Sequence, residues 1–160
     1  MVGGVEMRVE SNRAAGLRVR MLGALTIGRG DEALALPASR KVRALFAYLA
    51  LAAHAVSRSQ LCELLWDVPS DPRGELRWSL SKLRAVIDEP GRRRVHAHGE
   101  TIALDLSDCF VDAAEIARAA QEGFETLAPA RLRALAALFG GEFLDGLEIE
   151  RYYHFMCKTD

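Results

Sequence analysis

Hydrophobic residues recur at helical spacing in the middle of the chain, between residues 71 and 87. They are three or four positions apart and are Leu76, Leu80, Leu83 and Ile87. With 3.6 residues per turn, this spacing places them in one stripe along a helix. Asp71 and Pro72 are a typical helix start, because an acceptor at the cap precedes a residue whose φ is preset. We therefore predict a helix over 71–87 with one face suited to burial.

The face of this helix opposite the leucines is cationic and rich in hydrogen-bonding groups. It carries Arg77, Ser81, Lys82 and Arg84, with Trp78 among them. A helix with a buried stripe and a basic outer face suits the major groove of duplex DNA. On this stretch alone, a solvated amphipathic helix is the alternative interpretation, and the neighbouring elements are needed to choose between the two.

Two more helices are predicted upstream. The first is expected over 39–53, with Ser39 as its cap. Ser57 and Gln60 have the spacing of a capping box, in which each residue satisfies a free N–H group at the start of the second helix. That helix ends near Trp66, where a short loop follows and Pro69 and Pro72 prevent the helix from continuing. The order of helix, helix, short loop and cationic helix is typical of a helix-turn-helix.

Alternation of apolar and polar residues flanks the three helices. Residues 17–36 alternate around a turn at 28–31, which predicts an antiparallel sheet of two or three strands. After the third helix, residues 95–106 alternate on both sides of Gly99 and Glu100. This second pattern predicts a β-hairpin, which in such folds is called a wing.

Basic charge is concentrated in the same part of the chain. Three consecutive arginines, Arg92, Arg93 and Arg94, stand at the base of the predicted hairpin and extend the basic stripe of the third helix. The net charge is only −1, but residues 1–105 hold 16 Lys and Arg against 12 Asp and Glu, whereas residues 106–160 hold 5 against 10. This asymmetry indicates an anionic partner for the first part of the chain.

Helical periodicity returns at 112–121 and 130–139. With the earlier elements it predicts an α+β fold: a winged helix-turn-helix with an N-terminal antiparallel sheet and a C-terminal β-hairpin wing, followed by a short all-α segment. We expect a flexible lead-in over 1–16, a winged-helix domain over 17–107, and a helical segment over 108–160.

Composition narrows the classes of function. Half of the 160 residues are hydrophobic, but no apolar run approaches the roughly 20 residues that span a bilayer. The N-terminus has no apolar signal core, so we expect a cytoplasmic protein. Cys62, Cys109 and Cys157 are dispersed, which favours reduced thiols. No spacing typical of a nucleophile elbow, phosphate loop or zinc protease occurs, so an enzyme is disfavoured and no cofactor is expected.

Several stretches together resemble the DNA-binding domain of the Streptomyces antibiotic regulatory protein family, which has an OmpR-type winged helix. They are RMLGALTI in the first strand region, LLW before the Asp/Pro loop, and LRWSLSKLR ahead of the hairpin. GGEFLDGL, over 140–147, is similar to the opening of the bacterial transcriptional activation domain, a helical, tetratricopeptide-like module. The resemblance covers about 17–147, and family members continue through further helices, so we expect a partial or shortened chain.

The resemblance implies a transcription regulator that binds double-stranded promoter DNA, often as two copies on direct repeats. RNA polymerase and a second copy of the chain are the other partners that it allows. By motif position, the residues facing the major groove would be Arg77, Ser81, Lys82 and Arg84, with Arg73 near the helix start. Ser57 and Arg58 would contact phosphate, and Arg92, Arg93 and Arg94 would serve the wing.

Two residues depart from the family pattern. Glu100 stands at the predicted wing tip, where a carboxylate would meet the negative potential of the minor groove, so deep insertion of the wing is not expected. Trp78 is bulky for an outward position, and we expect it to pack on the neighbouring loop rather than to contact a base.

Other interpretations stay open. His96 and His98 share one face of a strand, but no nearby Cys or carboxylate pattern completes a metal site, so solvent-facing histidines are preferred. A winged helix can bind protein instead of DNA, although the charge on the third helix favours DNA. The apolar residues within 132–139 and 152–156 would fold back on the winged helix or pair between two chains.

Overall fold

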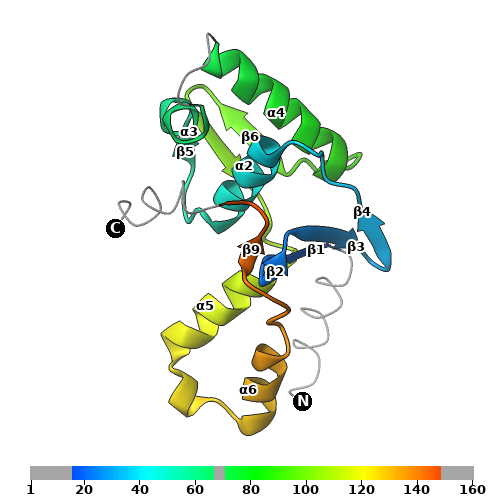
Figure 1. The fold of residues 1–160 in the computed structure, drawn as a ribbon, viewed down its shortest axis with the longest axis vertical. Helices are drawn as coiled ribbons and strands as arrows, with labels where there is room; N and C mark the ends of the chain where they lie inside the picture. The colour runs from blue at the N-terminus through cyan, green and yellow to red at the C-terminus, as the bar shows by residue number, and fades with distance from the viewer. Residues whose placement is uncertain (1–15, 67–70, 149–160) are drawn as a thin grey trace. The chain divides into compact units, whose positions relative to one another are not determined.

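The computed structural model describes residues 16–66 and 71–148, and these residues have the predicted α+β fold (Figure 1). They form two compact units. The trihelical unit contains residues 35–66, 71–106 and 147–148, and the two-sheet unit contains residues 16–34 and 107–146. The lead-in expected over 1–16, apart from Gly16, and the aromatic residues within 152–156 lie outside the described residues.

The trihelical unit packs three helices against a small antiparallel sheet. Its helices are α2 (Arg40–Leu51), α3 (Arg58–Leu65) and α4 (Pro72–Ile87), and its strands are β5 (Val56–Ser57), β6 (Val95–His98) and β7 (Thr101–Leu104). The strand β7 pairs with both of the others, so the sheet order is β5-β7-β6. The pair β6–β7 is the predicted wing, and the order of the three helices confirms the winged helix-turn-helix.

The helix α4 buries its predicted stripe completely. Leu76, Leu80, Leu83 and Ile87 are each at most 1% exposed. The helix packs on both α2 and α3, and burial of one leucine side chain contributes about 1.5–3 kcal/mol to folding. Because all four residues lie on one side, their burial sets the rotation of α4 about its own axis.

Side-chain caps begin all three helices where the sequence predicts them. Ser39 Oγ accepts from the N–H group of Val42, Ser57 Oγ from that of Gln60, and the Asp71 carboxylate from that of Gly74. The capping box at α3 is only half formed. The Gln60 side-chain amide donates to the Tyr48 hydroxyl at 3.0 Å, so it links α3 to α2 instead of reaching back to its own cap.

The two-sheet unit combines strands from both ends of the described chain. A four-stranded sheet has the order β4-β3-β1-β8, and a two-stranded sheet pairs β2 with β9. The strands are β1 (Leu17–Arg20), β2 (Gly23–Ala24), β3 (Thr26–Arg29), β4 (Glu32–Leu34), β8 (Phe110–Val111) and β9 (Phe143–Asp145); the helices are α5 (Asp112–Glu122), η1 (Phe124–Thr126) and α6 (Pro129–Ala136).

This grouping differs from the expected division at residue 107. The strands β1, β3 and β4 form the predicted antiparallel sheet. However, β8 pairs in parallel with β1, and β9 in parallel with β2. The segment over 108–160 was expected to be all-α, yet it supplies both of these strands. The N-terminal strands therefore belong to the same compact unit as the helices α5 and α6.

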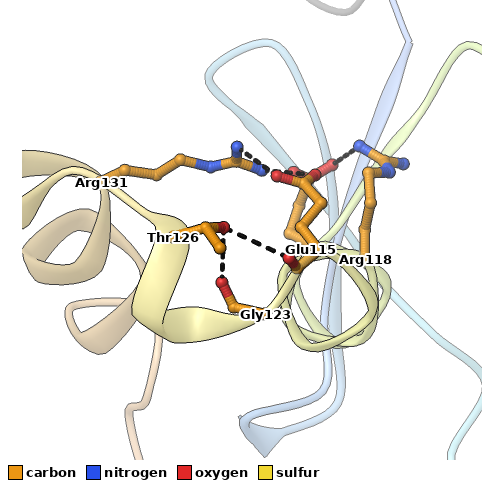
Figure 2. A network of polar contacts seen from close by, with 6 residues as sticks. Glu115, Arg118, Gly123, Thr126 and Arg131 are labelled. Atoms are coloured by element: carbon orange, nitrogen blue, oxygen red, sulfur yellow. Dashed lines mark hydrogen bonds and ion pairs between the residues drawn. The ribbon is translucent and has the colours of Figure 1, made fainter.

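Polar contacts hold the turn between α5 and α6 (Figure 2). Gly123 ends α5 with a φ of 89°, a conformation that glycine adopts without a steric penalty. The Thr126 hydroxyl donates to the carbonyl of Gly123 at 2.8 Å and to that of Glu122 at 3.2 Å. Arg131 of α6 then donates two hydrogen bonds to the Glu122 carboxylate, at 2.8 and 3.1 Å.

The apolar faces expected on these two helices are largely exposed. Ala119 is the buried alanine of α5, whereas Ala117 and Ala120, on the apolar side that helical periodicity predicts, are exposed. In and after α6, Leu135 is buried, but Leu132 and Phe139 are not. Periodicity located both helices, but it did not identify which side they bury.

A buried carboxylate joins the N-terminal strands to α5. Asp112 is completely buried, and its carboxylate accepts hydrogen bonds from the N–H group of Met21, at 2.8 and 3.0 Å, and from that of Leu22, at 3.0 Å. These two N–H groups follow the end of β1, and Asp112 is the first residue of α5. The carboxylate therefore satisfies backbone donors that would otherwise be buried without an acceptor.

Replacing Asp112 with alanine is expected to lower the free energy of unfolding by about 2–4 kcal/mol, because two buried N–H groups lose a charged acceptor. Urea denaturation followed by circular dichroism measures this loss. Asp145→Ala is the matched control, since Asp145 is an exposed carboxylate of the same unit, and it should change the value by less than about 0.5 kcal/mol. Equal stability of the two variants would contradict the anchoring role of Asp112.

Candidate nucleic-acid interface

The outer face of α4 presents cations on a rigid support. Arg77, Ser81 and Lys82 are exposed, and Arg84 is partly exposed, while the leucine stripe on the opposite side is buried. Among the described residues, none of these three cations forms an ion pair with a carboxylate. The helix therefore offers uncompensated positive charge at positions that the core holds in place.

Trp78 lies within this cationic face. It is 50% exposed, and the Lys82 Nζ atom is 5.3 Å from the centre of its ring, within the range of a cation–π contact. The loop residues 67–70, on which packing was expected, lie outside the described residues. The residue is nevertheless half exposed, so Trp78 occupies the outward position that its place on the helix indicates.

The turn of the wing is bound to the first turns of α3 and α4. Arg73 donates two hydrogen bonds to the Glu100 carboxylate, at 2.9 and 3.2 Å. The Arg58 backbone N–H group donates to the Glu100 carbonyl at 2.8 Å, and Arg58 Nε donates to the Gly99 carbonyl at 2.9 Å. Two of the arginines that the sequence assigned to DNA contacts thus meet the wing turn in this structure.

The ion pair between Arg73 and Glu100 shifts the acid–base equilibrium of both groups. The hydrogen bond from Arg73 lowers the pKa of Glu100, and the same bond raises the pKa of Arg73. Both groups are therefore charged at neutral pH. Since the two side chains are 54% and 65% exposed, the pair is accessible to competing ions and contributes little to stability.

Burial separates the three arginines at the base of the wing. The Arg94 side chain is only 1% exposed and its Nη2 atom lies 3.8 Å from Glu89, so this structure does not present it at the wing surface, where the resemblance implied a role for it. Arg92 is paired with Asp105 at 3.2 Å. Arg93 is exposed. The three arginines therefore do not form a uniform basic strip. Arg92 and Arg94 are paired with carboxylates of the same unit, and Arg93 is exposed.

The position of Arg94 is fixed by the end of α4. Asp88 follows the helix, and its carboxylate accepts from the backbone N–H groups of Arg94 and Val95 at 2.8 and 3.2 Å. The Arg94 carbonyl in turn accepts from the N–H group of Asp105. The chain thus enters β6 with the Arg94 side chain directed into the core.

Ser57, another residue for which a phosphate contact was expected, has a defined local role. Ser57 is partly buried, and its hydroxyl oxygen is occupied as the cap of α3, at 3.1 Å from the Gln60 N–H group. Cys62, one helical turn further on, is buried, and this burial raises the pKa of its thiol. The interaction of Glu100 with Arg73 was missed in the sequence, although an acidic residue at a hairpin tip beside a basic helix was a usable signal.

The histidines of the wing do not belong to a metal-ligand cluster within the described residues. His96 and His98 lie on β6, and no group of three or more His, Cys, Asp or Glu side chains that could hold a metal ion occurs within residues 16–66 and 71–148. In the same residues, every helix is too short or too polar to cross a membrane.

The fold is similar to a known structure. It superimposes with a TM-score of 0.66 on Mycobacterium tuberculosis EmbR, which was solved in complex with a low-affinity phosphopeptide. The sequence identity is 23%, and the match covers 88% of this chain but 41% of the EmbR chain. No protein-family model and no curated protein sequence matches. The likeness establishes the fold, and the chain spans about two fifths of the length of EmbR.

Replacing Arg94 with alanine is expected to lower the free energy of unfolding by about 3 kcal/mol, since it empties the space of a side chain that is only 1% exposed and leaves the partly buried Glu89 carboxylate without its cation. The neighbouring exposed residue provides the control, because Arg93→Ala should change stability by less than about 0.5 kcal/mol. Thermal and urea unfolding of both variants tests the difference. If the two variants unfold alike, Arg94 is not the buried residue of the triplet.

Proposed function

We propose that this chain is a cytoplasmic transcription regulator that binds duplex DNA in a sequence-specific way, with α4 in the major groove. The observation that carries the proposal is the outer face of α4, where Arg77 and Lys82 are exposed and Arg84 is partly exposed on a helix whose other side is buried in the core. A winged helix with such a face fits the width of the major groove. The sequence resemblance to antibiotic regulatory proteins and the EmbR-like fold support it.

The cations of α4 would make two kinds of contact with DNA. Contacts with phosphate release counterions and give affinity that falls with salt concentration. Contacts of an arginine with guanine are bidentate and give sequence preference of about 1–3 kcal/mol each. Arg77 and Arg84 have the fork geometry needed for guanine, whereas Lys82 offers a compact ammonium beside Trp78. Arg93 is the exposed cation of the wing base, so it is the remaining candidate for a phosphate contact there.

The alternative function is a winged helix that binds protein. An exposed face with uncompensated arginine and lysine is less suited to a protein partner than to a polyanion. Selection from a library of random duplexes separates the two, because a protein-binding module would enrich no sequence. For the DNA-binding regulator that we propose, a second copy of the chain on a direct repeat and RNA polymerase are further partners.

Arg77→Ala and Arg84→Ala are each expected to weaken binding to a selected duplex about 10-fold or more, and binding to a random duplex by less than about threefold. The larger loss reflects a bidentate contact with guanine, worth about 1–3 kcal/mol. Fluorescence anisotropy with both duplexes, at 50 and 200 mM salt, measures the two effects.

Arg20→Ala is the matched control for charge, since Arg20 is an exposed arginine of the two-sheet unit. It should leave the affinity for the selected duplex unchanged. Equal losses on selected and random duplexes would mean that Arg77 and Arg84 contact only phosphate. If the unmodified protein binds neither duplex at 50 mM salt, the proposed function is wrong.

A further inference from the structure

Trp78 is a large apolar side chain in a face otherwise made of charged and polar groups. It is half exposed on α4, one residue after Arg77 and one helical turn before Lys82 and Ser81. A tryptophan with an open face is among the side chains that contribute most when a partner covers them. The cations around it indicate that this partner is anionic.

The major groove of DNA offers one apolar group to such a side chain. Base edges there carry hydrogen-bond donors and acceptors, and the exception is the methyl group at C5 of thymine. We propose that Trp78 contacts the 5-methyl group of a pyrimidine, which makes it a specificity-determining residue of α4. This inference rests on the proposed DNA binding and adds the chemistry of one base position to it.

The contact of Trp78 with Lys82 supports this assignment. The Lys82 ammonium lies 5.3 Å from the ring centre, so a cation and an apolar surface are presented together. The indole can then contact a methyl group while the ammonium donates a hydrogen bond to a neighbouring base acceptor or to a phosphate. A thymine next to an acceptor-bearing group would satisfy both, whereas an unmethylated cytosine would leave the indole without an apolar contact.

Replacement of thymine by deoxyuridine tests the contact directly, because it removes only the methyl group. In a duplex obtained by selection, replacement of one thymine in each half-site is expected to weaken binding about fourfold. This is the effect of losing the free energy of burying about one methyl group. The variant Trp78→Ala should lose this dependence. Arg20→Ala, an exposed residue of the two-sheet unit that lies outside α4, should keep it, and circular dichroism checks that each variant is folded.

The outcomes separate this inference from the function on which it rests. A deoxyuridine effect that is equal in the unmodified protein and in Trp78→Ala overturns the assignment, since another side chain then reads the methyl group. Selective binding with no effect of deoxyuridine at any thymine also overturns it but leaves the proposed function in place. If no duplex is enriched by selection, both are wrong.

A different observation, the ion pair at the wing turn, carries a second inference. Arg73 donates two parallel hydrogen bonds to the Glu100 carboxylate, which is the arrangement that a guanidinium also offers to a phosphate group. The Arg58 N–H group binds the Glu100 carbonyl and holds the wing turn at the start of α3, while the contact with Arg73 places the Glu100 carboxylate beside α4. We infer that Glu100 competes with DNA phosphate for Arg73 and weakens binding until it is displaced.

The variant Glu100→Gln is expected to bind a random duplex about three- to fivefold more tightly at 50 mM salt, the upper range for release of an exposed ion pair. Glu75→Gln is the matched control, because Glu75 is an exposed carboxylate in the first turn of α4. It should produce a smaller gain, which measures the general effect of removing one negative charge.

The same change in the Arg73→Ala background tests whether the effect passes through Arg73. Glu100→Gln should then give no more gain than Glu75→Gln. A gain that persists without Arg73, or the absence of any gain in the unmodified background, overturns the competition. If neither Glu100→Gln nor the unmodified protein binds any duplex, the DNA-binding function itself is wrong.

Discussion

The burial of one side of α4 is the constraint on which the rest of the trihelical unit depends. Four residues at helical spacing, Leu76 to Ile87, are removed from water against α2 and α3. An apolar stripe of this kind has one favourable rotation, because any other would expose leucine and bury arginine. The position of every outward side chain of α4 follows from that choice, which is why the helix can present a defined chemical pattern.

Positive charge in this unit has two different uses. On the outer face of α4, Arg77, Lys82 and Arg84 lie on the solvent side and are not paired with a carboxylate within the described residues. At the wing, Arg58, Arg73 and Arg94 hold the hairpin to the helices through carbonyl and carboxylate oxygens. A count of basic residues therefore overstates the positive charge available to a polyanion, because some of these residues are bound to oxygens of the protein itself.

The two-sheet unit depends on a separate anchor. Its sheets are built from strands of two to four residues, and strands this short have little stability alone. The Asp112 carboxylate binds the backbone where β1 ends and places α5 beside it. Parallel pairing of β8 with β1 and of β9 with β2 then closes the unit.

Local patterns in the sequence determined the helices, their caps, the hairpin and the cationic face of α4, because each depends on residues within a few positions of one another. The tertiary structure decided the partners across longer separations. Asp112 meets Met21 across 91 positions, and Glu100 meets Arg73 across 27. Arg93 and Arg94 are adjacent in the sequence, yet one is exposed and the other buried. Periodicity cannot distinguish them, because burial there is set by how the chain leaves α4 and enters β6, and that path exists only once the core has formed.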